Sequence, residues 1–472
     1  MSGIHQILLG FGIYQLASSA PPPPPPGDLM SLTFDVGLSP SNEVYLPLYG
    51  TVDVIINWGD GNIETVNTPG AKMHTYSNPL GIYTVTIAGT LTRYGDISFF
   101  FFPLYSNSQQ KLASVNQFNN GLQSLEYAFY GATNLTSVPS SIPTSLTNLQ
   151  YSFFNATNFN SPNVSSWNTN NVTIMNGIFR GCINFNQPLN SWDVSSVTNM
   201  SDVFTACTNF NQPLNSWNVS SVTNMTFMFG GCTDFNQPLN SWDVSSVTNM
   251  DFMFDSCTNF DQPLNSWDVS SVTTMRGTFT NCTNFNQSLN SWNVSSVTNM
   301  DFMFGDCTNF NQSLNSWNVS SVTSMIGMFQ RCFNFDQPLN SWNVSNVTDM
   351  SNMFYQCIYF NQPLDSWNVS SVFFMPFLFF GCTNFNQPLN SWNVSSVSLM
   401  NDMFSNCISF NQPLDSWNVG AVSNMDYMFQ NATNFDQDLS GWCVALIPEQ
   451  PVGFDDGTIS WVLPKPIWGT CP

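Results

Sequence analysis

The chain is poor in charged side chains, and poorest in cations. Of its 472 residues, 8% are charged, and 29 Asp and Glu outnumber 7 Lys and Arg to give a net charge of −22. The repetitive part of the sequence carries only Arg180, Arg276 and Arg331. Because a protein that binds a nucleic-acid backbone or an anionic membrane surface needs clustered cations, the sequence predicts neither partner.

Histidine is almost missing as well. Only His5 and His74 occur, so the repeats cannot build a His-based catalytic triad or a His-rich metal site. We therefore expect no enzyme activity, no metal and no cofactor. The apolar stretch at the start of the chain is too short and too interrupted by Gly to span a membrane, so no membrane span is expected.

The first segment, residues 1–29, combines an apolar peptide with six prolines, Pro21 to Pro26. It has the apolar region and small residues of a secretory signal but lacks the cations of a signal's first part. The alternative is a retained anchor on a stiff polyproline stalk that docks into another protein. The expected anchor residues are Ile4, Ile7, Leu8, Leu9, Phe11, Ile13 and Tyr14.

Residues 30–105 predict an all-β domain. Alternating apolar runs such as 52–56 and 83–87 are separated by Gly-Asp-Gly and Asn-Pro turns. The stretch 57–61 (NWGDG), followed by 74–77 (HTYS) and 81–87 (GIYTVTI), resembles the PKD-type immunoglobulin-like sandwich. That resemblance implies a β-sandwich in which Trp58 is core and Asp60 lies in a structural turn.

From about residue 120 a 25-residue period governs the sequence. Trp recurs at every 25th position from Trp167 to Trp442, and Met, Phe and Cys columns keep the same step. A period of this length means a solenoid of stacked coils. We expect degenerate copies at 106–165, regular repeats at 166–442 and a C-terminal cap at 443–472, since terminal copies of such arrays are atypical.

One coil can be interpreted from its apolar spacing. Trp192 and Val194 are two residues apart, which indicates a strand of a parallel sheet with both side chains inside. The spacing of Val197, Met200, Val203 and the residues after them is helical. The predicted fold is therefore mixed: an N-terminal all-β sandwich followed by a right-handed, leucine-rich-repeat-like α/β solenoid with a parallel sheet.

The repeat Val-x-x-Met-x-x-Met-Phe-x-x-Cys-x-x-Phe-Asn-Gln-Pro-Leu-x-x-Trp-x-Val resembles the BspA-like leucine-rich-repeat surface proteins. The resemblance covers about residues 120–472, including the tail with Trp442, Cys443, Trp468 and Cys471. It implies surface display and contact rather than catalysis, since several such proteins are adhesins and large viruses also carry the repeat.

Cysteine and aspartate columns each have two interpretations. Cys182 to Cys407 could form a metal or redox ladder, but Ala replaces Cys in the end copies, which favours a packing role. Cys443 and Cys471 fall outside this column, and we expect a disulfide between them, which favours an extracellular setting. Asp193, Asp243 and Asp268 share a column with Asn, which favours a solvated face over a catalytic pair.

Positions that vary between coils are the candidates for partner contact, because stacking does not fix them. In each coil, one Met and the Phe four residues after it recur in the 25-residue step, for example Met200 and Phe204, and we call them the column Met and the column Phe. The variable positions lie one and two residues after each of them, and we call these positions Met+1, Met+2, Phe+1 and Phe+2. The candidate contacts are Arg276, Gln330, Arg331, Tyr355, Gln356, Phe377 and Phe380. The surrounding aromatic run, residues 373–380, is either an exposed patch or buried by a bend at Pro376. The outward face of Asn, Ser and Asp is an alternative surface for a glycan.

These observations predict a non-enzymatic, surface-exposed structural or adhesion protein. The first hypothesis is a virion appendage or fibre component, located on the virion surface or outside the cell. It would attach through its N-terminus to other structural proteins, form homo-oligomers and contact a host surface protein or glycan. The alternative is a secreted or cell-surface bacterial adhesin of the BspA-like type. A polysaccharide hydrolase is a distant third.

Overall fold

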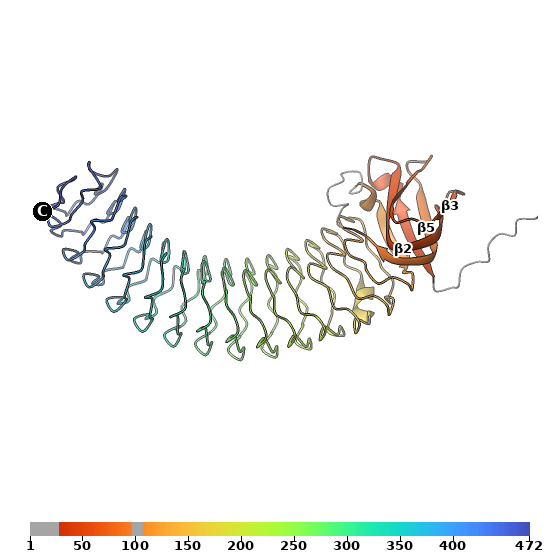
Figure 1. The fold of residues 1–472 in the computed structure, drawn as a ribbon, viewed down its shortest axis with the longest axis horizontal. Coiled ribbons are helices and arrows are strands. Elements are labelled where there is room, and N and C mark those ends of the chain that lie inside the picture. Colours follow the sequence, from red (N-terminus) through yellow and green to blue (C-terminus); the bar gives the residue numbers. More distant parts are fainter. Residues whose placement is uncertain (1–27, 97–106) are drawn as a thin grey trace, which may run out of the picture.

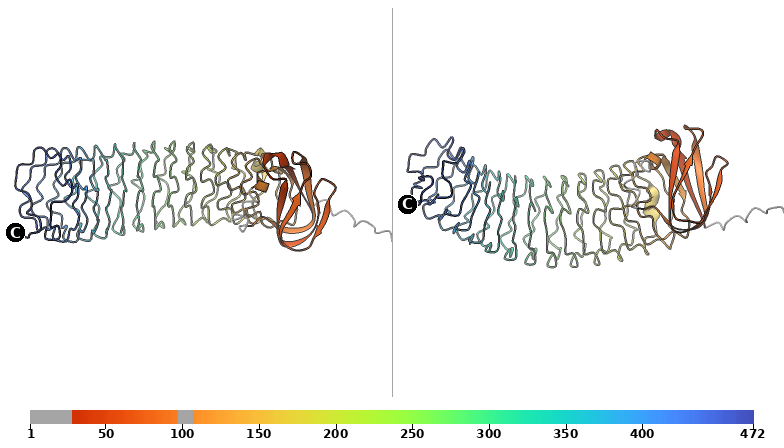
Figure 2. Two further views of the ribbon diagram at one scale, coloured as in Figure 1. Left: turned by 90° about the horizontal axis from the view of Figure 1, so that it is seen from above. Right: turned by 45° about the horizontal axis from the view of Figure 1, so that its top comes forward.

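The computed structural model describes residues 28–96 and 107–472. An N-terminal β-domain is followed by a long array of stacked coils that curves into an arc (Figure 1). Seen from above, the array is nearly straight, so the curvature lies in one plane (Figure 2). The expected N-terminal anchor residues and the polyproline segment lie outside the described residues.

The N-terminal domain is built on one antiparallel sheet in the order β3-β2-β5-β1-β6, with β4 paired to β2. Its elements are β1 (Leu29–Asp35), η1 (Val36–Leu38), β2 (Glu43–Asn57), β3 (Ile63–Val66), β4 (Gly70–Thr75), β5 (Ile82–Tyr94) and β6 (Leu112–Gln117). The long β2 pairs with β4 along its first half and with β3 along its second half. The strands are therefore all linked in one hydrogen-bonded sheet, in which β2 pairs with β3, β4 and β5.

Two strands join the domain to the coils. Arg93 at the end of β5 forms a parallel bridge with Ser124, and Ser114 in β6 forms one with Ser137. The sheet extends past the expected boundary at residue 105, because β6 pairs with β1. One continuous buried core runs from the domain through all the coils. The β-domain thus covers the first coil, which would otherwise expose its apolar face.

The coils contain neither the expected strand nor the expected helix. Trp192 and Val194 are buried as predicted, but they lie in a turn region, and coils pair in parallel only at single residues such as Asn199 and Asn224. Among the described residues only 107–109 are α-helical, and the array contains the short 3₁₀ helix η3 (Pro162–Ser166). The solenoid is thus not of the α/β type.

Consecutive turns explain the helix-like spacing. In the coil of Met200, the N–H groups of Met200, Asp202 and Phe204 donate to carbonyls of the next coil, while those of Val203 and Thr205 donate three residues back. Asp202 and Ala206, four residues apart, have positive φ, which a helix cannot contain. Two consecutive four-residue turns also direct the residues at positions 0, 3, 4 and 7, counted from Met200, into the core. The sequence pattern therefore cannot distinguish such turns from a helix.

Polar ladders along the array lock neighbouring coils in register. The indole Nε1 of Trp292 donates to the carbonyl of Leu264 in the preceding coil at 3.0 Å. The Oδ1 atom of Asn236 accepts the N–H of Asp261 and the side-chain amide of Gln262 from the next coil. The Cys257 thiol donates to the carbonyl of Phe229. Each coil therefore pairs buried polar groups of its neighbour in hydrogen bonds and also covers the neighbour's apolar face.

The ring spacing between coils explains the curvature. Within one pair of coils, the separation of equivalent ring centroids grows steadily from one side of the coil to the other. It is 4.7 Å for Tyr355–Phe380, 5.7 Å for Phe354–Phe379, 6.0 Å for Phe360–Phe385 and 6.4 Å for Trp367–Trp392. The side with Met+2 and Phe+1 is therefore the inner, concave side of the arc. We call the segment from Met to Phe+2 of each coil the inner wall.

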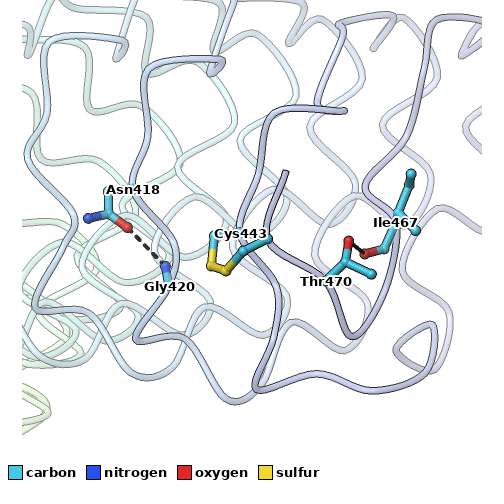
Figure 3. Close-up of a disulfide and its surroundings, with 6 residues drawn as sticks. Asn418, Gly420, Cys443, Ile467 and Thr470 are labelled. Carbon is cyan, nitrogen blue, oxygen red and sulfur yellow. Dashed lines mark hydrogen bonds between the residues drawn. A yellow bond between two sulfur atoms is a disulfide. The ribbon is translucent and has the colours of Figure 1, made fainter.

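The C-terminal end is covered by its own aromatic residues and a disulfide. Trp461 meets Phe435 edge to face at 4.8 Å, and its indole donates to the carbonyl of Gln437. Cys443 and Cys471 are joined by a disulfide next to Gly420, whose backbone N–H donates to Asn418 (Figure 3). Ser occupies the place of Gly420 in most other coils, so the substitution leaves space beside the disulfide.

Candidate interaction surface

Side chains that vary between coils gather on the inner wall. The column Met, the residue three positions on and the column Phe point into the core, as Met375, Leu378 and Phe379 show with 0% exposure. The intervening Met+1, Met+2, Phe+1 and Phe+2 residues are left on the concave side. The positions that the repeat leaves free to vary are therefore those that line the inside of the arc.

Four of the seven expected contact residues lie together in the coils of Met350 and Met375. The rings of Tyr355 and Phe380 are stacked at 4.7 Å, and Phe377 lies 6.0 Å from Phe380 and 6.4 Å from Tyr355. Gln356 adjoins this group through Gly381. We call Tyr355, Phe377 and Phe380 the aromatic cluster.

The other three expected residues are placed apart from one another. Gln330 and Arg331 lie one coil before the aromatic cluster, and Arg331 forms an ion pair with Asp306 at 3.3 Å. Arg276 lies two coils earlier still, with its guanidinium 5.7 Å from the ring centroid of Phe252. The structure therefore does not join all seven residues into one site.

No bend at Pro376 buries the aromatic run. Phe373 and Phe374 are 48% and 39% exposed, and the backbone ladder continues through Asn352 N–H to the carbonyl of Pro376 at 3.0 Å. In several coils the residue before Met is Asn, whose side chain accepts the N–H of Met+1, as Asn224 does for Thr226. Here Phe374 supplies no acceptor and Pro376 has no N–H, so the two changes compensate. The burial alternative is wrong for Phe373 and Phe374.

A shallow groove continues the apolar surface beside the aromatic cluster. It has a volume of about 570 Å³ and is lined by Phe333, Gln356, Ile358, Phe380, Gly381, Thr383 and Asn406. Phe333 and Ile358 stand one residue after the column Cys, where most coils have Thr. Sequence reasoning missed both residues, although their departure from the Thr column was a signal that could have found them.

The aromatic residues at Met+2 adopt an unfavourable backbone conformation. Phe377 has a φ of 58°, and Phe227, Phe252 and Phe302 have similar values. A left-handed conformation costs a bulky residue about 1–2 kcal/mol, and such strain concentrates at functional sites. Asn or Gly would fit this position with less strain, so the rings are retained for their contacts.

One carboxylate beside the cluster was not expected. Asp402 stands at Met+2 of the next coil and is half-buried. Burial raises the pKa of Asp402; the Asp426 carboxylate adds to this effect, and a hydrogen bond from Asn401 opposes it. The surface is thus aromatic and apolar with one acidic group at its edge.

The other candidate groups have structural surroundings. Cys182 to Cys407 are buried free thiols, and burial raises their pKa, as at Cys232. Hydrogen bonds from Ser195 lower the pKa of Asp193, and matching serines do the same for Asp243 and Asp268. Burial pushes the pKa of Asp60 up, but hydrogen bonds from His74 and Asn62 outweigh it and lower that pKa. No group of three or more His, Cys, Asp or Glu suited to a metal occurs in residues 28–96 or 107–472.

The repeat pattern places the chain in a known family. The family described as "Mycoplasma protein of unknown function, DUF285" matches residues 123–231, 147–266, 214–312, 249–366 and 348–454. These overlapping matches span residues 123–454, more than half of the chain. The chain belongs to the DUF285 family. It is therefore a repeat protein with leucine-rich-repeat-like character, and the aromatic cluster lies within the DUF285 region.

Solved structures similar to this DUF285 chain are distant. A leucine-rich repeat protein from Eubacterium ventriosum has 13% identity and a TM-score of 0.37 over 87% of this chain and 96% of that one. A TLR13–ssRNA13 complex has 12% identity and a TM-score of 0.19 over 74% of this chain and 63% of that one. No curated protein matches the sequence.

The described part of the DUF285 chain comprises residues 28–96 and 107–472. Among those residues, none of the helices has the length and apolar character needed to cross a bilayer.

Proposed function

We propose that this DUF285 protein is a non-enzymatic, surface-exposed adhesion protein that contacts a partner through the inner wall of its arc. One observation carries the proposal: the inner wall is where the coils differ from one another, and it holds the half-buried aromatic cluster, next to the exposed Phe373 and Phe374 that precede the column Met. Monomeric soluble proteins rarely expose contiguous apolar surface without a binding role. The remaining columns repeat nearly unchanged and serve stacking.

The family description supports a bacterial source over a virus. DUF285 is described from Mycoplasma, so the bacterial adhesin becomes the leading hypothesis and the virion appendage the second. The weakly charged surface and the disulfide between Cys443 and Cys471 support an extracellular location. The N-terminal domain, with its PKD-like sequence, would act as a spacer between the attachment point and the arc.

Protease treatment of intact cells or particles of the natural source tests the location. Thermolysin is added before and after lysis, and peptides of residues 166–442 are quantified by mass spectrometry together with those of an internal marker protein. We expect loss of these peptides while the marker stays intact. Protection of the peptides until lysis would overturn the proposal.

A further inference from the structure

Two coils carry Asp at Met+2, and they have different surroundings. Asp202 forms an ion pair with Arg180, which stands at Phe+1 of the preceding coil, and accepts a hydrogen bond from Tyr151 at 3.2 Å. The guanidinium of Arg180 also lies 5.5 Å from the ring centroid of Phe154, at Phe+1 one coil earlier. In this part of the array an Arg side chain fills the space between an aromatic ring and a carboxylate.

The second carboxylate has an aromatic neighbour instead of a cation. Phe380 occupies the Phe+1 position before Asp402, and Tyr355 occupies the position that corresponds to Phe154. The carboxylate of Asp402 accepts a hydrogen bond from Asn401 at 3.3 Å, and no ion pair forms at Asp402 within the described residues. Phe380 therefore takes the place that Arg180 has beside Asp202, so the half-buried carboxylate of Asp402 adjoins an aromatic ring and no cation.

We infer that the aromatic cluster and Asp402 bind an arginine side chain of a partner protein, with apolar residues beside that arginine lying in the groove of Phe333 and Ile358. The inference deepens the proposed adhesion function and rests on it. Arginine fits better than lysine because its planar guanidinium stacks on aromatic rings while its N–H groups reach a carboxylate. The contact of Arg180 with Phe154 and Asp202 shows this arrangement within the same chain.

Charge complementarity supports a cationic occupant over a second copy of the chain. The coil of Met375, residues 375–399, contains no charged residue. In the next coil, the Met+2 position carries the Asp402 carboxylate. The whole chain carries a net charge of −22, so two copies repel each other, whereas a basic segment is attracted. Exposed Phe373 and Phe374 extend the apolar surface available to the residues that flank the arginine.

Binding of a short synthetic peptide to the full chain tests the inference. The probe is acetyl-Ser-Leu-Arg-Leu-Ser-amide, and its affinity is measured by isothermal titration calorimetry. One control peptide has citrulline in place of arginine, which keeps the shape but removes the charge; another has serine in place of both leucines. We expect each control to bind at least tenfold more weakly. Equal affinity for the arginine and citrulline peptides would overturn the inference.

Two variants locate the site. Asp402→Asn should weaken binding of the arginine peptide at least tenfold. Phe380→Arg should abolish it, because the new guanidinium would pair with Asp402 as Arg180 does with Asp202. The matched control is Asp202→Asn, which removes the existing pair and should leave peptide affinity unchanged. Wild-type affinity in Asp402→Asn would refute the assignment even if Phe380→Arg fails to fold.

Two further outcomes separate the alternatives. Self-association that disappears in a Phe373→Thr, Phe374→Asn double variant, measured by analytical ultracentrifugation, would make a second copy the occupant and overturn the inference. Peptide binding by a chain that proteases cannot reach on intact cells would refute the adhesion function while leaving the arginine site intact. The two proposals can therefore fail independently.

Discussion

At the scale of the residue, each column side chain combines packing with a polar contact to the next coil. Trp292 is 3% exposed, stacks on Trp267 at 6.3 Å and donates its indole N–H to the preceding coil. Ala can replace the column Cys at Ala432 because a small apolar group still fills that place. Phe in place of Trp would keep a ring but remove one of the two hydrogen bonds that the carbonyl of Leu264 accepts, leaving the one from Trp267 N–H.

Substitutions of Trp292 separate these two contributions. Trp292→Phe should lower the free energy of unfolding by about 0.5–1.5 kcal/mol, because it removes the indole hydrogen bond while the carbonyl of Leu264 keeps the bond from Trp267 N–H. Trp292→Ala should cost about 3–5 kcal/mol because it also opens a cavity. Urea denaturation followed by circular dichroism measures both values. Equal losses in the two variants would show that ring packing contributes nothing beyond the indole hydrogen bond, and an unchanged stability of Trp292→Phe would show that this hydrogen bond contributes nothing.

The ionisation of Asp402 gives arginine binding a pH dependence. Burial raises the pKa of Asp402, so the folded chain holds this proton more tightly than the unfolded chain. The contribution of Asp402 to the free energy of unfolding is therefore most favourable when the pH is below the ordinary Asp pKa of about 3.9. This contribution declines as the pH rises through the raised pKa. Peptide binding needs the ionised form and should follow the opposite course. It is complete above the raised pKa and is lost as the pH falls through it.

Calorimetric titrations from pH 4 to pH 7 check this expectation. The midpoint for the arginine peptide should lie above about 3.9, and the Asp402→Asn variant should show a flat profile. A wild-type affinity that does not change with pH would contradict the role of Asp402.

At the scale of the element, the period of the sequence defines the coil but not its local structure. The 25-residue columns identify which residues are inside, and burial of Met200, Phe204 and Trp217 confirms the inward phase. Turns with left-handed residues at Asp202 and Ala206 have the same apolar spacing as a helix, which is why the helix prediction was wrong. The site was predictable in part: Phe377 and Phe380 stand at positions that vary between coils, whereas the role of Asp402 emerges only from comparing its surroundings with those of Asp202.

The terminal elements protect the array, and the C-terminal one depends on its disulfide. The Cys443–Cys471 bond closes a loop with a sequence separation of 28. A loop of this length gives a stabilisation of about 3–4 kcal/mol in the chain-entropy treatment. A Cys443→Ser, Cys471→Ser double variant should therefore open the last coil, and hydrogen exchange of residues 443–472 should rise much more than that of 200–400. Cys407→Ala is the control and should leave exchange in 443–472 unchanged. Unaltered exchange in the double variant would count against this role.

At the scale of the whole molecule, the array is modular in steps of one coil. Equivalent residues of neighbouring coils make equivalent contacts, as the Trp242–Trp267 and Trp267–Trp292 stacks show. Stability of such arrays is close to a sum of coil and interface contributions. The length of the arc is therefore set by the number of coils and not by any single long-range contact.

Deletions of one coil test this modularity. Removing residues 276–300 joins Met275 to Asp301 at equivalent positions, so Phe302 should stack on Phe252 as Phe252 stacks on Phe227. The shortened chain should fold with a slightly lower Tm and a smaller maximum dimension in X-ray scattering. Removing residues 276–299 instead shifts the columns after the junction by one position relative to those before it. The two parts of the array can then no longer stack, and cooperative unfolding should be lost. Similar behaviour of the two deletions would rule out register as the organising constraint.

The graded spacing of the coils also determines how the molecule responds to a pull on its ends. Hydrogen bonds such as Phe354 N–H to Leu378 link the closely spaced coils along the inner edge, whereas the outer edge has Trp rings 6.3–6.5 Å apart and their indole hydrogen bonds to the preceding coil. A load along the chord must straighten the arc by separating its inner edge, where the coils are bonded most tightly. We therefore expect the arc to resist a pull on its ends at the inner edge, which is the edge that carries the aromatic cluster.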